Sequence, residues 1–139
     1  MLKLIVAAAL LASPASAKKK TEKPMEWKGQ QNGSMTVEHE VVADEKAWER
    51  LWLRLGKDAP ALDFKKFVAV AVFAGERPTG GFSVDFLDPA PVRDGGLKVQ
   101  YKIKEPPPDA FVTQAFALPW KVRAFPRPRG AVTVEAAKK

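Results

Sequence analysis

The chain has 139 residues, a formal net charge of +7 and no cysteine. The lack of cysteine excludes disulfides, thiolate metal sites and cysteine nucleophiles together. Much of the positive excess lies in polar segments near the two ends, at Lys18, Lys19, Lys20, Lys23, Lys138 and Lys139. This placement indicates charged tails. The sequence also lacks the basic and aromatic pattern of RNA-binding domains, so we expect no nucleic-acid partner.

The first 17 residues have the features of a secretory signal peptide. A short positive stretch ends at Lys3, an apolar run covers 4–12, and Ala15-Ser16-Ala17 is a cleavage signal. The apolar run is about half of the ~20 residues that a membrane-spanning helix needs. We therefore expect a periplasmic or secreted protein that starts at Lys18 and has no integral membrane segment. A retained membrane anchor is the alternative, whereas a lipoprotein is excluded because no cysteine could carry the lipid.

The remaining chain predicts a disordered basic linker over 18–24, one β-rich domain over 25–135 and a basic tail over 136–139. The domain begins with a short strand over 25–31, and the Asn-Gly step within 31–34 predicts a hairpin turn. A second strand is predicted over 35–42, with Met35, Val37, His39 and Val41 on one face. We expect a structural role for His39 among these apolar neighbours, and a solvent-facing position for Glu38 and Glu40.

One helix is predicted after the second strand. Asp44 can accept hydrogen bonds from the free N–H groups of the first turn, and Gly56 supplies the C-terminal stop. The apolar stripe at 3,4 spacing consists of Ala47, Trp48, Leu51, Trp52 and Leu55. Because this stripe contains two tryptophans, the helix is expected to pack firmly on a sheet.

The rest of the domain is predicted to be strands. The segment 67–74 is apolar on both faces, as in a covered central strand. Strands are also predicted over 82–87, 97–104 and 131–135, and 112–118 is either a short strand or an extended segment. The strand over 120–125 is placed at an edge because of its flanking prolines. The fold class is therefore α+β, a mainly antiparallel sheet or sandwich with one packed amphipathic helix.

The inventory of catalytic side chains is nearly empty. His39 is the only histidine, so a Ser-His-Asp triad could form only around it, with Ser34 or Ser83. Neither serine lies in a Gly-x-Ser-x-Gly elbow, and no metal-ligand spacing is present. We expect no enzymatic activity, no metal and no cofactor.

The glycine-rich segment 75–81 is the remaining motif. It is not a phosphate-binding loop, because it lacks the Gly-Lys-Ser/Thr ending and precedes a strand instead of a helix. It is either a wide turn, in which Gly80 and Gly81 adopt unusual φ angles, or a recognition loop that offers Arg77, Pro78 and Thr79 beside an accessible backbone.

The run Gly75-Glu76-Arg77-Pro78-Thr79-Gly80-Gly81-Phe82-Ser83-Val84 resembles the PrcB C-terminal-domain family of exported bacterial proteins. A Trp-containing helix before Asp63-Phe64, a later Val112-Thr113-Gln114-Ala115 and Pro119-Trp120-Lys121-Val122 extend the resemblance over roughly 36–126. Phe82 stands where the family more often has Tyr. The resemblance implies association with, and stabilisation of, an exported protease complex, and no catalytic residues.

A second resemblance concerns two loops. The segment 78–82 is similar to the Asn-Pro-Thr-Thr-Gly-Tyr loop of chagasin-like cysteine-protease inhibitors, and Leu118-Pro119-Trp120 is similar to a later loop of the same family, in the same chain order. We therefore predict a non-enzymatic protein-binding domain whose partner is an exported protease or another envelope protein. The alternatives are a protease inhibitor and an envelope domain with no protease connection. The candidate partner-binding residues are Arg77, Pro78, Thr79, Gly80, Gly81, Phe82, Pro119 and Trp120.

Overall fold

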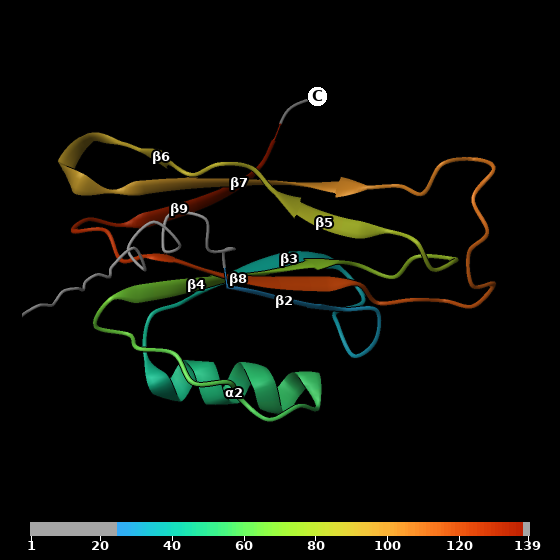
Figure 1. The fold of residues 1–139 in the computed structure, drawn as a ribbon, viewed down its shortest axis with the longest axis horizontal. Helices are drawn as coiled ribbons and strands as arrows, with labels where there is room; N and C mark the ends of the chain where they lie inside the picture. The colour runs from blue at the N-terminus through green and yellow to red at the C-terminus, as the bar shows by residue number, and fades with distance from the viewer. Residues whose placement is uncertain (1–24, 138–139) are drawn as a thin grey trace, which may run out of the picture.

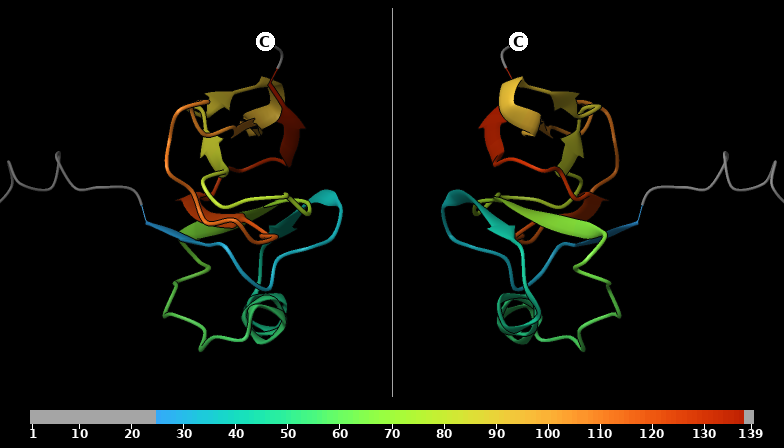
Figure 2. Two further views of the ribbon diagram at one scale, coloured as in Figure 1. Left: turned by 90° about the vertical axis from the view of Figure 1, so that its right-hand side faces the viewer. Right: turned by 90° about the vertical axis from the view of Figure 1, so that its left-hand side faces the viewer.

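A computed structural model describes residues 25–137, so the predicted signal peptide, the linker over 18–24 and the last two residues of the predicted tail lie outside the described residues. One helix, a four-stranded sheet and a second sheet form three layers (Figure 1). Views along the layers show the helix beneath the first sheet and the second sheet above it (Figure 2). This arrangement confirms the predicted α+β class with a mainly antiparallel sandwich and one packed helix.

The first sheet has the strand order β2-β8-β4-β3, and all its pairs are antiparallel. Its strands are β2 (Glu26–Gly29), β3 (Val37–Val42), β4 (Phe67–Ala74) and β8 (Trp120–Pro126). In the second sheet, β7 pairs antiparallel with β5 and β6 and parallel with β9. Its strands are β5 (Ser83–Phe86), β6 (Ala90–Pro91), β7 (Leu97–Lys104) and β9 (Val132–Ala136). A 3₁₀ turn, η2 (Arg93–Gly95), connects β6 to β7.

The helix α2 (Glu45–Leu55) begins and ends at the predicted caps. The Asp44 carboxylate accepts a hydrogen bond from the N–H of Ala47, and Gly56 adopts a left-handed φ of 73°. The buried residues of the helix are Trp48, Leu51, Trp52 and Leu55. The predicted apolar stripe is therefore confirmed as the face that packs on the first sheet.

Strand β4 serves two cores at once. Its odd-numbered residues from Ala69 to Phe73 pack with the helix and with Trp120 and Val122 of β8. Its even-numbered residues from Val68 to Ala74 pack with Val84, Val99, Tyr101 and Phe125 between the two sheets. Small side chains at Ala69 and Ala71 lie under the helix, which is what lets its tryptophans approach the sheet. The central position predicted for 67–74 is confirmed.

The predicted hairpin between the first two strands is wrong. Strand β2 pairs with β8, whereas β3 pairs with β4, so the two strands lie at opposite edges of one sheet. Asn32 does adopt a left-handed φ of 67°, as a turn residue should. The chain then crosses the sheet end, where a Cβ on Gly33 would lie 2.4 Å from the carbonyl oxygen of Leu118. The Asn-Gly step indicates only a local turn. Which strands pair depends on the burial of their side chains.

The edge position predicted for 120–125 is also wrong, because β8 lies between β2 and β4. Proline disrupts a central strand only where its missing N–H belongs to the ladder. Here Pro119 precedes the strand, Pro126 is its last residue and Pro128 follows it. The interior residues therefore keep every N–H that the two neighbouring strands require.

The two faces of β3 are assigned differently from the prediction. Val37, His39 and Val41 do share a face, but β3 is an edge strand and this face is largely exposed. His39 is exposed, and its ring centroid lies 6.4 Å from that of Tyr101. The opposite face, with Glu38 and Glu40, is directed toward the helix layer and is only partly exposed. The structure therefore does not support the structural role expected for His39, and it places Glu38 and Glu40 on the helix side of the strand with only partial exposure to solvent.

Candidate functional site

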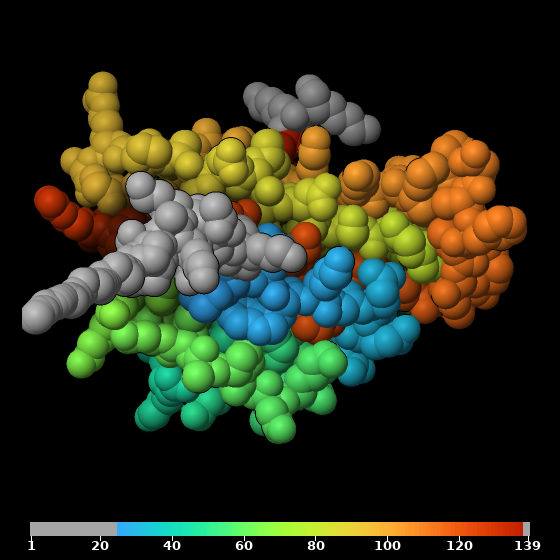
Figure 3. Space-filling view, in the orientation of Figure 1, coloured from blue at the N-terminus to red at the C-terminus, as the bar shows by residue number. Residues whose placement is uncertain are grey.

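A groove of about 500 Å³ opens at one end of the sandwich. Its walls are the chain segments 28–31 and 80–83, together with Thr113 and 115–117. These segments come from β2, from the loop before β5 and from the loop before β8. In the space-filling view they meet in the right-hand half of the face shown, as blue, yellow-green and orange atoms (Figure 3).

The glycine-rich loop is held in place by the segment that leads into β8. The main chain of Arg77 exchanges two hydrogen bonds of 2.9 Å with that of Ala117, and the N–H of Gly80 donates to the carbonyl of Thr113 over 2.9 Å. The Arg77 guanidinium donates to the carbonyl of Ala74 from Nε at 3.0 Å and from Nη2 at 2.7 Å. Its charge lies 5.4 Å from the ring centroid of Phe82. Arg77 is thus a brace for the loop.

Gly81 is required by both its backbone angle and its surroundings. It adopts a φ of 91°, and a Cβ there would lie 2.7 Å from a methyl group of Val112 and 2.9 Å from Pro106. Such distances leave no room for a side chain. The loop is therefore packed against the segment after β7, and the main chain on its other side remains accessible from the groove.

The structure brings the two predicted loops together but separates their side chains. Gly80, Gly81 and Phe82 line the groove. Pro78 is exposed next to it, and Thr79 is half-buried with its hydroxyl donating to the carbonyl of Gly80.

Pro119 and Trp120 were expected to form a second contact surface for a partner, and this is wrong, because both side chains are buried. The Trp120 indole N–H donates to the carbonyl of Gln31 over 2.8 Å, and its ring lies against Gly29. Trp120 therefore supports the groove from beneath, as part of the helix-side core.

Several groove residues were missed by sequence reasoning. Phe116 is 70 % exposed at the groove, and Gln30 ties the two sheets together because its amide donates to the carbonyl of Phe82 over 2.9 Å. Lys28 and Thr113 also line the groove. No sequence signal identifies the β2 residues, because their place depends on pairing with a strand about 90 positions later. The one sequence signal for Phe116 was that a large aromatic residue lies in a segment without clear helix or strand periodicity.

Some of the positive side chains around the groove have acidic neighbours, and one does not. Behind β2, Lys121 lies 3.8 Å from Glu26 and 4.0 Å from Asp85, and Arg123 lies 3.6 Å from Glu26. These cations are mostly buried and already have acidic neighbours. Lys28 is the one charged residue that lines the groove, and the described residues provide no acidic partner for it within ion-pair distance.

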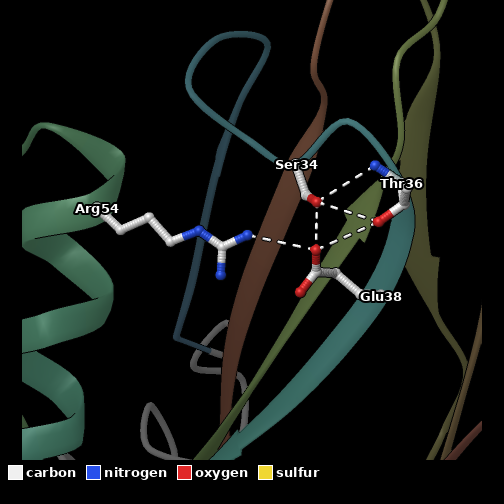
Figure 4. A network of polar contacts seen from close by, with 4 residues as sticks. All are labelled: Ser34, Thr36, Glu38 and Arg54. Atoms are coloured by element: carbon white, nitrogen blue, oxygen red, sulfur yellow. Dashed lines mark hydrogen bonds and ion pairs between the residues drawn. The ribbon is translucent and has the colours of Figure 1, made fainter.

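A polar network lies elsewhere, between β3 and the helix (Figure 4). The Ser34 and Thr36 hydroxyls both donate to the Glu38 carboxylate, and the Arg54 guanidinium lies 3.4 Å from it. The hydrogen bond from Ser34 is the main cause that lowers the pKa of Glu38, and the charge of Arg54 adds to this, while partial burial opposes it. The network ties the crossing segment to the helix.

The geometry provides no catalytic constellation among the described residues. Ser34 bonds to Glu38, whereas His39 lies on the opposite face of the strand, so the two do not form a dyad. Ser83 lines the groove, but no aspartate, glutamate or histidine lines it as well. Within 25–137, no group of three or more His, Cys, Asp or Glu side chains could hold a metal ion, and no helix is long and apolar enough to cross a membrane.

Comparisons with known proteins relate part of the chain to one family. Comparisons with curated proteins and with solved structures returned no significant match. The family model described as PrcB C-terminal matches residues 68–126, which run from β4 through β8. Two of the three groove walls lie within these residues, while the β2 wall and the helix lie outside them. The resemblance to the PrcB C-terminal family is thereby confirmed over residues 68–126.

Proposed function

We propose that this chain is a non-enzymatic binding subunit that associates with an exported protease, or with another protein of the cell envelope, and stabilises it. The observation that carries the proposal is the groove, which lies largely in the family-matching residues and is lined by main chain, apolar and uncharged polar groups with one lysine. Such a lining can bind a polypeptide, and it contains no aspartate, glutamate or histidine.

The alternative of a chagasin-like inhibitor is not favoured by the loop geometry. An inhibitor of that design must insert exposed loop side chains into a protease cleft. Pro119 and Trp120, which the resemblance assigns to one such loop, are buried here. Inhibition of papain by the purified protein would nevertheless revive this alternative.

Capture of a partner tests the proposal. Immobilised protein is incubated with envelope extract, and bound proteins are identified by mass spectrometry. We expect an exported protease to be retained, and its half-life at 37 °C to be longer in the presence of the chain than in its absence.

Phe116→Ala alters the groove at an exposed position and should release the partner without lowering the melting temperature. Phe111→Ala is the matched control, since Phe111 is fully exposed and does not line the groove. Equal retention by the wild-type protein and the Phe116→Ala variant would contradict the assignment of the groove.

A further inference from the structure

The walls of the groove are unusual in being formed by consecutive residues. Residues 28–31 line one side and 80–83 line another. Lys28 and Gly29 are the last two residues of β2, and Gln30 and Gln31 follow it, so the groove begins at the end of this strand. Three of these eight wall residues are glycines, of which Gly81 is exposed, Gly29 is half-buried and Gly80 is buried.

The pairing pattern identifies which backbone groups point into the open. The carbonyl of Met25 accepts the N–H of Ala124. Antiparallel pairing alternates along a strand, so Trp27 and Gly29 also direct their N–H and C=O groups to β8. Glu26 and Lys28 direct theirs to the free edge of the sheet, since β2 is the end strand. This edge at Lys28 is where the groove begins.

We propose that the groove binds an extended, acidic segment of the partner, which adds to the first sheet as a fifth strand along β2. This inference rests on the proposed function and specifies its binding mode. The main chain of Lys28 pairs with the incoming strand, and its ammonium group binds a carboxylate of that strand. Alternate apolar side chains of the segment pack against Phe82 and Phe116.

The positive charge of Lys28 favours an acidic segment as the occupant of the groove. Lys28 is the one charged residue in the lining, whereas the nearby Lys121 and Arg123 already contact Glu26 or Asp85. An acidic segment would meet an uncompensated cation, and a basic one would be repelled.

Peptide selection tests this mode directly. Random decapeptides displayed on phage are selected against the full chain, and an enriched peptide is synthesised with a fluorescent label. We expect enriched peptides to contain Asp or Glu and to alternate apolar and polar residues. Methylation of the peptide backbone, one nitrogen at a time, should weaken binding tenfold or more at every second residue only, because alternate N–H groups face β2.

Matched variants locate the site. Lys28→Ala should weaken the acidic peptide about three- to tenfold, and Lys28→Glu should reverse the preference toward basic peptides. Phe116→Ala should weaken binding about tenfold. Lys46→Ala, on the solvent face of the helix, and Phe111→Ala should leave the affinity unchanged.

Three outcomes would overturn the inference: no peptide is enriched, the methylation profile lacks a period of two, or the control variants weaken binding as much as the groove variants. Self-association of the chain that Phe116→Ala abolishes would also overturn it, because the occupant would then be a second copy. If the envelope partner is still captured and stabilised in any of these cases, the proposed function stands and only its binding mode fails. If no partner is captured, the proposed function fails.

Discussion

Trp48 and Trp52 are neighbours on α2, and the same substitution can be compared at both positions. In that comparison the energy of the lost side-chain volume cancels. Trp48 and Trp52 are 0 % and 2 % exposed, and their rings meet edge-on with centroids 5.5 Å apart. The Trp48 indole N–H donates to the carbonyl of Pro60 over 2.7 Å. The Trp52 indole N–H is buried and has no hydrogen-bond partner within residues 25–137. Replacement of each residue by Phe removes the same atoms but different polar interactions.

The expected difference follows from these polar interactions. Trp48→Phe loses a hydrogen bond, which contributes about 0.5–1.5 kcal/mol to the free energy of unfolding. Trp52→Phe removes an unsatisfied buried donor, which relieves about 1–3 kcal/mol of desolvation cost. The volume lost is common to both, so Trp48→Phe should destabilise the protein by about 1.5–4.5 kcal/mol more than Trp52→Phe. Replacement by Ala empties either site and should cost roughly 3–5 kcal/mol.

The assay is urea denaturation followed by far-UV circular dichroism, because tryptophan fluorescence itself changes in these variants. Equal slopes of free energy against urea concentration are required, so that the midpoints report stability alone. If Trp52→Phe destabilises the protein as much as Trp48→Phe or more, the hydrogen-bond assignment in this core is wrong.

Four further predictions concern other sites. The pKa of Glu38 is lowered in the folded state, so the ionised carboxylate stabilises the protein above its ordinary pKa of 4.5. This stabilisation is lost as the pH falls through the lower folded pKa, so the acid-induced drop in melting temperature should be smaller in Glu38→Gln. Arg77→Ala should cost about 1.5–3 kcal/mol in urea titrations, since its guanidinium makes two hydrogen bonds to one carbonyl, whereas Thr79→Ala should stay within about 0.5 kcal/mol; equal losses would contradict the bracing role. Gly81→Ala should lower the melting temperature markedly, because of its positive φ and lack of space, and an unchanged melt would show that the loop can move. N-terminal sequencing of the exported protein should read from Lys18, and a retained Met1 would exclude cleavage.

The elements with strong local patterns were predictable from the sequence. Helix α2 carries both caps and a 3,4 stripe, and β4 and β7 have the same bounds as the predicted strands. Strand β6 escaped prediction because two residues, one of them proline, form no pattern. Pairing was harder, since the Asn-Gly step at 32–33 indicates a turn but cannot indicate that β8 and β4 lie between the strands on either side.

The candidate site was predictable only in the part that one loop encodes. The glycine-rich run located Gly80, Gly81 and Phe82, because glycine pairs indicate close backbone approach. The same reasoning misjudged Trp120, since an aromatic beside proline looks alike in a loop and at the start of a buried strand. Lys28 and Phe116 reach the groove through tertiary packing, which no local pattern records.

The pairing of β2 with β8 also sets the order of events during folding. Trp27 lies opposite Val122, and Leu97 lies opposite Val132, so each sheet needs residues from the last fifth of the chain before it is complete. A nascent chain lacking those residues has no partner for β2 and no cover for one side of β4. Non-local pairing of this kind slows folding to the millisecond-to-second range. The chain must therefore extend through β8 before the groove is complete, and a partner that recognises the groove binds only after β2 and β8 have paired.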